Sequence, residues 1–101
     1  MAKDLALCAL LDVYGAFLSE KQREIMSHYF NDDLSLSEIA ENEGITRQAV
    51  SDIIRRGEAA LKEYEEKCGY HKKISILQKI CSSNISDKDK ISGVIKIVED
   101  F

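Results

Sequence analysis

The sequence predicts an all-α protein: a small helical bundle that contains a helix-turn-helix and is followed by a C-terminal helical extension. Apolar residues recur at three- and four-residue spacing in successive segments, and polar residues that can cap helices precede several of these segments. The 101 residues include no proline and only five glycines, so few breaks interrupt the helical patterns. The composition, 45% apolar and 32% charged, is that of an ordinary globular protein.

Two helices are expected before the helix-turn-helix. The first runs from about Asp4 to Leu18, because its apolar residues form one stripe at helical spacing. Ser19 then caps a second helix, with Gln22 as its capping-box partner. The residues expected to face inward are Leu7, Leu10, Leu11, Tyr14, Phe17 and Leu18 in the first helix and Ile25, Met26, Tyr29 and Phe30 in the second. No basic residues are interleaved with these aromatic side chains, so we expect a core and not a surface that stacks nucleic-acid bases.

The segment from Leu34 to Leu61 has the pattern of two short helices joined by a glycine turn, which is a helix-turn-helix. Ser35 caps the first helix, and Glu38 is placed to complete a capping box. Gly44 ends that helix through a positive φ. Thr46 caps the second helix, whose apolar stripe continues through Gly57 to Leu61. The residues expected to build the motif are Ser35, Ile39, Ala40, Gly44, Ile45, Thr46, Val50 and Ile54, with Ile45 plugging the turn.

The chain is expected to divide into a helix-turn-helix domain over residues 1–70, with its core at 35–61, and a C-terminal part over residues 71–101. Gly69 ends or kinks the second helix of the motif. Two amphipathic helices follow, separated by the polar loop of residues 82–84. Their apolar residues are Ile74, Ile76, Leu77, Ile80 and Cys81 in one helix and Ile91, Val94, Ile95 and Val98 in the other. These helices either pack on the core or mediate dimerisation, which would present two recognition helices about 34 Å apart to DNA.

The distribution of charge weighs against strong non-specific DNA binding. Residues 1–70 contain eight Lys/Arg and fourteen Asp/Glu, a net charge of −6, whereas residues 71–101 contain six and four, a net charge of +2. Duplex affinity depends largely on neutralising phosphates, so an acidic domain approaches DNA slowly. The second helix of the motif is the exception, because residues 46–62 carry four basic residues and two acidic ones.

Two resemblances narrow the function. The segment from about Ser19 to Leu61 resembles region 4 of sigma-70-type factors, which reads the upstream promoter element through a helix-turn-helix. A longer match covers roughly residues 5–70: VYGAFLSEKQREIMSHYF, followed by DLSLSEIAENEGITRQAVSDIIRRGEAALKEYEEKCG, is similar to the YlxM family of bacterial helix-turn-helix proteins. The gene of that family lies beside the gene for the signal recognition particle GTPase. The resemblance therefore implies a regulatory part in the signal recognition particle pathway.

Carried over from the sigma-type motif, the groove-facing positions lie in the first turns of the second helix. The candidate nucleic-acid-binding residues are Arg47, Gln48, Ser51, Asp52, Arg55 and Arg56. Arg47 can form two hydrogen bonds with guanine and Gln48 two with adenine, each pair giving about 1–3 kcal/mol of discrimination. Asp52 can accept from a cytosine amino group, or instead pair with Arg55 or Arg56. Sigma factors commonly carry arginines where this chain has Ala49 and Ser51, so contacts of the sigma type are missing here.

Other classes of site find little support in the sequence. No phosphate-binding glycine loop or nucleophile elbow is present, so no catalytic residue and no cofactor are expected. The three cysteines are widely spaced, and neither His28 nor His71 has a second ligand at useful spacing, so no metal site is expected. No apolar run approaches the roughly 18 residues that span a bilayer, and the amino end leads into an amphipathic helix, so we expect a cytoplasmic protein.

Three hypotheses about partners remain. The chain is a sequence-specific DNA-binding regulator, or an adaptor that contacts the signal recognition particle GTPase or its RNA through the same fold, or a module for homodimerisation. The start of the recognition helix favours DNA. The acidic surface suits a basic partner and favours the adaptor. The apolar faces of the two tail helices favour self-association.

Overall fold

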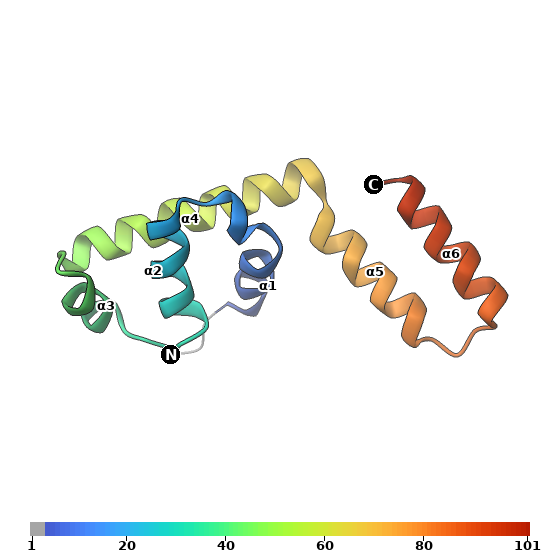
Figure 1. Cartoon of the computed structure of the whole chain (residues 1–101), viewed down its shortest axis with the longest axis horizontal. Helices are drawn as coiled ribbons and strands as arrows, with labels where there is room; N and C mark the ends of the chain where they lie inside the picture. The colour runs from blue at the N-terminus through green and yellow to red at the C-terminus, as the bar shows by residue number, and fades with distance from the viewer. Residues whose placement is uncertain (1–3) are drawn as a thin grey trace. The chain divides into compact units, whose positions relative to one another are not determined.

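The computed structural model describes residues 4–101 and is all-helical over that range (Figure 1), which confirms the expected fold class. Its elements are α1 (Leu5–Tyr14), a 3-10 turn η1 (Gly15–Phe17), α2 (Glu20–Phe30), α3 (Leu36–Glu43), α4 (Arg47–Cys68), α5 (Tyr70–Ser82) and α6 (Asp87–Glu99). They form two compact units. The first ends at Lys67 and holds α1 to α3 with nearly all of α4, and the second, Cys68–Phe101, holds α5 and α6.

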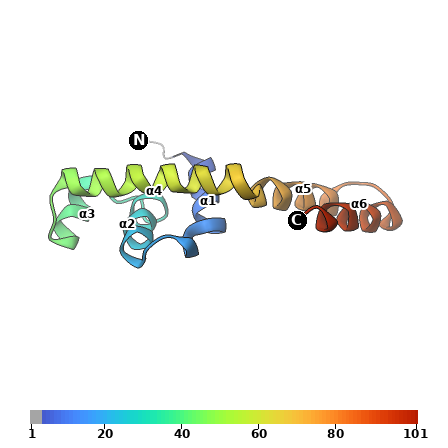
Figure 2. The same cartoon turned by 90° about the horizontal axis from the view of Figure 1, so that it is seen from above.

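The first unit is built around α4, which passes α3 at its amino-terminal end, then α2, and then α1 in its carboxyl-terminal half (Figures 1 and 2). Four residues of α4 face this core at three- and four-residue spacing: Val50, Ile54, Gly57 and Leu61. The largest fully buried side chains are Tyr14, Ile25, Met26, Ile39, Val50 and Leu61. Each helix of the unit thus contributes to one core, as the apolar stripes in the sequence indicate.

The stretch before α2 differs from the prediction of one helix ending at Leu18. α1 ends at Tyr14, and the chain continues as the 3-10 turn η1, where the Leu18 N–H donates to the Gly15 carbonyl over 3.1 Å. Leu18 is then extended, which lets the Ser19 hydroxyl cap α2 by accepting from the Gln22 N–H over 3.2 Å. The changed path turns Phe17 outward, so that 64% of it is exposed, and its assignment to the core was wrong.

The helix-turn-helix consists of α3, the turn at Gly44 and the first part of α4, and its caps form as predicted. The Ser35 hydroxyl accepts from the Glu38 N–H over 3.1 Å, and the Glu38 carboxylate accepts from the Ser35 N–H over 3.0 Å. Gly44 has φ +67°, a conformation that side chains with a Cβ rarely adopt. The Thr46 hydroxyl accepts from the Ala49 N–H over 3.0 Å.

Ile45 departs from its expected role in the turn. Its backbone N–H donates to the Ala40 carbonyl over 3.1 Å and so helps to end α3, but 37% of the residue is exposed. The prediction that its side chain fills the interior of the turn was therefore wrong, because more than a third of the residue is exposed to solvent. The other apolar residues expected in the motif, Ile39, Ala40, Val50 and Ile54, are all buried.

The capping box should give Glu38 a measurable acid-base signature. Hydrogen bonds from the backbone and hydroxyl of Ser35 hold the pKa of Glu38 below its usual value of 4.5. Because the folded-state pKa is depressed, this contribution to the stability of α3 is present above about pH 4.5 and is lost as the pH falls through the folded-state value. We expect a carboxyl NMR titration of Glu38 to give a depressed pKa that rises part of the way toward its ordinary value in Ser35→Ala, because alanine keeps the backbone N–H and loses only the hydroxyl. Equal values in the two proteins would contradict the capping role.

The second unit is a hairpin of two helices lying side by side (Figures 1 and 2). Gly69, with φ +66°, ends α4 and precedes α5, so it ends that helix and does not merely kink it. Ser86 caps α6 by accepting from the Asp89 N–H over 3.2 Å. The two expected amphipathic helices therefore form, but none of their residues is buried.

Candidate nucleic-acid interface

The six candidate residues all lie on the first three turns of α4, on the side away from the core of the first unit. Arg47, Gln48, Arg55 and Arg56 are exposed, and Ser51 and Asp52 are half-buried. This end of the helix is stabilised by the Thr46 cap and, on its opposite side, by the packing of Val50 and Ile54 into the core. Side chains presented from a capped and buried helix have a fixed direction, as readout of base edges requires.

A shallow groove runs along this face between the start of α3 and α4. Leu36, from the first turn of α3, lines one stretch of it together with Arg47, Gln48 and Ser51. The next stretch is lined by Ser51, Arg55 and Glu58 on its polar side and by Tyr29, Leu36 and Ile54 on its apolar side. The fold thus brings Arg47, Ser51 and Arg55 onto one strip beside α3. The sequence pattern placed Tyr29 on an inward face and gave no sign that Tyr29 and Leu36 line this groove.

Asp52 pairs with two of the candidate residues, Gln48 and Arg55, and leaves Arg47 and Arg56 without a partner among the described residues. Its carboxylate accepts from the Gln48 amide over 3.2 Å and from the Arg55 guanidinium over 2.5 Å. The pairing with Arg55 realises one of the alternatives open from the sequence. Arg47 and Arg56 make no hydrogen bond or ion pair with any residue in the described part of the chain. They are therefore the cations of this face that can approach a phosphate or a base without first losing a partner.

On the hypothesis that this face binds duplex DNA, replacing Asp52 should strengthen the binding. Asp52→Asn removes one negative charge from the face and releases Arg55, and an exposed pair such as this one is weak, about 0–1 kcal/mol. We expect a threefold to tenfold gain in affinity for mixed-sequence duplex at about 50 mM salt, decreasing as salt rises. A fluorescence anisotropy titration measures it.

The matched control for Asp52→Asn is Asp12→Asn, which changes the net charge equally at an exposed position in α1. Because Asp12 lies outside the groove-facing strip, this variant should bind nearly as the wild type does. Equal gains in the two variants would show that only the overall charge matters and that Asp52 does not lie in the interface.

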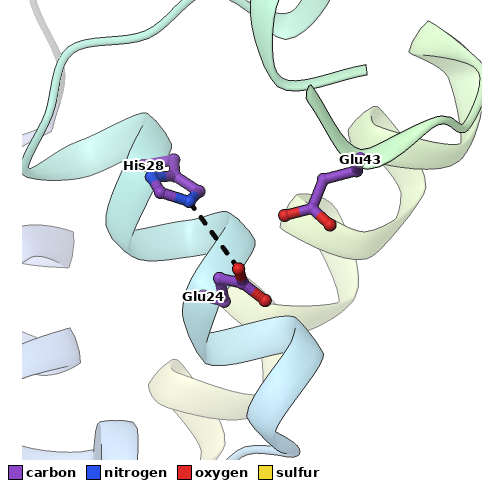
Figure 3. A group of neighbouring side chains, drawn as sticks. All are labelled: Glu24, His28 and Glu43. Carbon is purple, nitrogen blue, oxygen red and sulfur yellow. Dashed lines mark ion pairs between the residues drawn. The ribbon is translucent and has the colours of Figure 1, made fainter. Parts of the chain in front are cut away.

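A cluster of charged side chains joins α2 to the end of α3 (Figure 3). Lys21 donates to Glu43 over 2.6 Å and lies 3.8 Å from Glu24, and the hydrogen bond to Glu43 raises the pKa of Lys21 above its usual value. His28 lies 4.0 Å from Glu24 and 2.9 Å from Asp32. These contacts form a network of polar side chains that spans α2 and the end of α3.

The same cluster corrects one expectation from the sequence. The sequence pattern predicts no second ligand at useful spacing from His28, but ligand atoms of Glu24, His28 and Glu43 lie within 4.8 Å of one another. Glu24 stands four residues before His28 in α2, whereas Glu43 is brought in by α3. Since Lys21 already neutralises Glu43, a cation would have to displace it, and we assign no metal to the cluster.

The helix-turn-helix geometry agrees with a comparison to protein families. A family model described as "Putative helix-turn-helix protein, YlxM / p13 like" matches residues 1–100. The chain belongs to this YlxM/p13-like family. The resemblance stated from the sequence over residues 5–70 is thereby confirmed and extended into the hairpin.

Curated bacterial relatives in the YlxM/p13-like family are about half identical to this chain. A UPF0122 protein of Symbiobacterium thermophilum is 51% identical over 67% of this chain and 64% of its own length. One from Shouchella clausii is 55% identical over 64% of this chain and 60% of its own, and one from Halalkalibacterium halodurans is 49% identical over 77% and 75%. The matched segment thus spans less than two thirds of the first two relatives.

Among the helices that the structure describes, none combines the length and the apolar character that crossing a membrane requires.

Proposed function

We propose that this protein is a DNA-binding regulator, acting in the bacterial cytoplasm, that reads duplex DNA in the major groove with the first turns of α4. The observation that supports this most is the strip of Arg47, Ser51 and Arg55 beside the start of α3, on a helix that is capped by Thr46 and buried along its opposite side. A helix-turn-helix uses this part of its second helix to contact base edges.

Five side chains of the face have a defined part in the proposal. Arg47, which has no partner within the described residues, reads guanine through two hydrogen bonds. Gln48 reads adenine once its amide exchanges Asp52 for the base. Arg55 and Arg56, further along the helix, contact phosphates, and Ser51, which lines the groove together with Arg47, bonds either a base or a phosphate.

The net charge sets the kind of binding to expect. The chain carries −4 overall, while residues 46–62 carry four basic residues and two acidic ones. Attraction to phosphates is therefore local, and non-specific affinity should be low and strongly dependent on salt. A protein of this kind depends on base contacts more than on its overall field, so selection from a pool of sequences is the appropriate first experiment.

The test is selection from random-sequence duplex DNA with the full chain at about 50 mM salt, followed by titration of the recovered sequence. We expect an enriched sequence that binds at least tenfold more tightly than the starting pool. Random-sequence RNA serves as the parallel pool. Enrichment of RNA alone, or of nothing in either pool, would overturn the proposal.

A second candidate function is favoured by the acidic surface of the first unit: an adaptor that contacts the signal recognition particle GTPase or its RNA. The network of Lys21, Glu24 and Glu43 belongs to this surface, which suits a basic protein better than a polyanion. Titration of the purified particle components distinguishes the two functions. Binding that Glu24→Lys weakens and Arg47→Ala leaves unchanged would establish the adaptor.

A further inference from the structure

We propose that the α5–α6 hairpin is a dimerisation element, in which the exposed apolar face of one hairpin packs against the same face of a second copy of this chain to form a four-helix bundle. The proposal does not depend on DNA binding. Its starting point is the absence of any buried residue in either helix of the hairpin.

A unit of this size cannot build a core from its own residues. Cys68–Phe101 is shorter than the roughly 40 residues below which domains need disulfides, metals or association. Its cysteines are free, with Cys81 exposed, so no disulfide supports it. The side chains that could hold a metal ion gather in the first unit and not in Cys68–Phe101, so association is the remaining means by which two such helices gain a core.

The contacts inside the hairpin use one side of α6 and leave another free. A Cβ on Gly93 would lie 3.2 Å from Ile80, so the helices approach closely at their middle. At the end of the hairpin where α5 begins and α6 ends, the rings of Tyr70 and Phe101 stack with their centroids 5.5 Å apart. There Lys73 also donates to the Asp100 carbonyl over 2.6 Å. These contacts fix which face of the hairpin remains outside.

The outer face of α6 is apolar at helical spacing. Ile91, Ile95 and Val98 are 61%, 52% and 57% exposed and stand four and three residues apart, which is the pattern of a seam between packed helices. A groove beside them is mostly apolar, and its lining residues are Cys81 from α5 and Asp87, Lys90, Ile91, Val94 and Ile95 from α6. We name this surface, defined by Ile91, Ile95, Val98 and the groove, the hairpin face.

A second copy fits the hairpin face better than a charged partner does. The groove carries one acidic and one basic residue, Asp87 and Lys90, so its net charge is zero. A groove without net charge does not favour a nucleic acid or a strongly charged protein. Two 13-residue helices, each about 20 Å long and about 10 Å apart, present a face of roughly 20 by 20 Å. Two such faces bury on the order of 800–1,000 Å², which is at the lower limit of specific interfaces and corresponds to a dimer that dissociates on dilution.

Sedimentation equilibrium of the full chain, without nucleic acid, tests the proposal over about 5–500 µM, the range in which such a small interface should form. The subunit mass is 11.4 kDa, and we expect the weight-average mass to rise toward twice that value. Ile95→Lys should keep the protein monomeric, whereas Ser92→Lys, which adds the same charge at an exposed polar position of α6, should leave the dimer intact. A wild type that is monomeric throughout, or a dimer that both variants form equally, would overturn the proposal.

The reactivity of the Cys81 thiol reports whether the hairpin face is covered, because Cys81 lines the groove. In a variant with Cys8 and Cys68 replaced by serine, we expect the reaction of Cys81 with a thiol reagent to slow as protein concentration rises. Slow reaction at every concentration in a monomeric protein would mean that the hairpin face is covered within one chain. Fast reaction at every concentration would mean that no second copy covers it. Either result contradicts the proposal, even where Ile95→Lys unfolds the hairpin.

Discussion

Gly57→Ala is expected to destabilise the first unit, although alanine normally stabilises the middle of a helix by about 1 kcal/mol relative to glycine. The reason is the contact with Met26. A Cβ on Gly57 would lie 2.0 Å from the Met26 sulfur and 2.8 Å from its terminal methyl, and Met26 is fully buried, so its side chain must repack within the core. Overpacking of this kind costs about 1–3 kcal/mol. Urea unfolding followed by far-UV circular dichroism measures the change in the free energy of unfolding.

The control for Gly57→Ala is the same substitution in a Met26→Ala background. With the methionine side chain removed, the added methyl group has room, and the substitution should become neutral or stabilising. This reversal of sign is the specific signature of the Gly57–Met26 contact. Stabilisation by Gly57→Ala in the wild-type background would show that α2 and α4 do not approach as closely as described.

Arg47→Ala is expected to have the largest effect on binding. A bidentate contact to guanine contributes about 1–3 kcal/mol, so affinity for a selected duplex should fall by about tenfold to a hundredfold. Discrimination should be lost at one base pair, while the remaining positions of the selected sequence keep their preference. Titration of the selected duplex and of its single-base variants measures both effects.

The control for Arg47→Ala is Arg23→Ala, which removes the same charge from an exposed position in α2. It should weaken binding only slightly and equally for all sequences, because it changes the overall field alone. Neither substitution should alter the circular dichroism spectrum, since Arg47 makes no hydrogen bond or ion pair in the described part of the chain. Equal losses in the two variants would exclude Arg47 from base recognition.

Local signals in the sequence were sufficient for much of the fold. The caps by Ser19, Ser35 and Thr46 and the positive φ of Gly44 depend on residues within a few positions of one another, and all four are observed. The helical stripes identified the core of the first unit for the same reason. Phe17 and Ile45 lie where the chain passes between helices, and helical periodicity does not predict the path of the chain there. Their assignment to the interior was wrong.

Contacts between distant segments could not be read from spacing. The sequence placed Gly57 on the inner stripe of its helix but gave no sign that Met26 fills the space beside it. Glu43 lies fifteen or more residues from Glu24 and His28, so their cluster exists only once α3 packs on α2. For the candidate interface, the resemblance to the sigma-type motif supplied the candidate residues, and the sequence left Asp52 able to pair with either Arg55 or Arg56; the structure pairs it with Arg55.

The most direct test of the proposed interface is a backbone amide NMR titration of the full chain with a selected duplex. We expect the largest shifts at residues 35–38 and 47–56, where the start of α3 and the first turns of α4 border the groove. Amides of α1 should change little. Shifts confined to the acidic cluster around Glu24 and Glu43, or to the hairpin, with none in the first turns of α4, would contradict recognition of DNA by this helix.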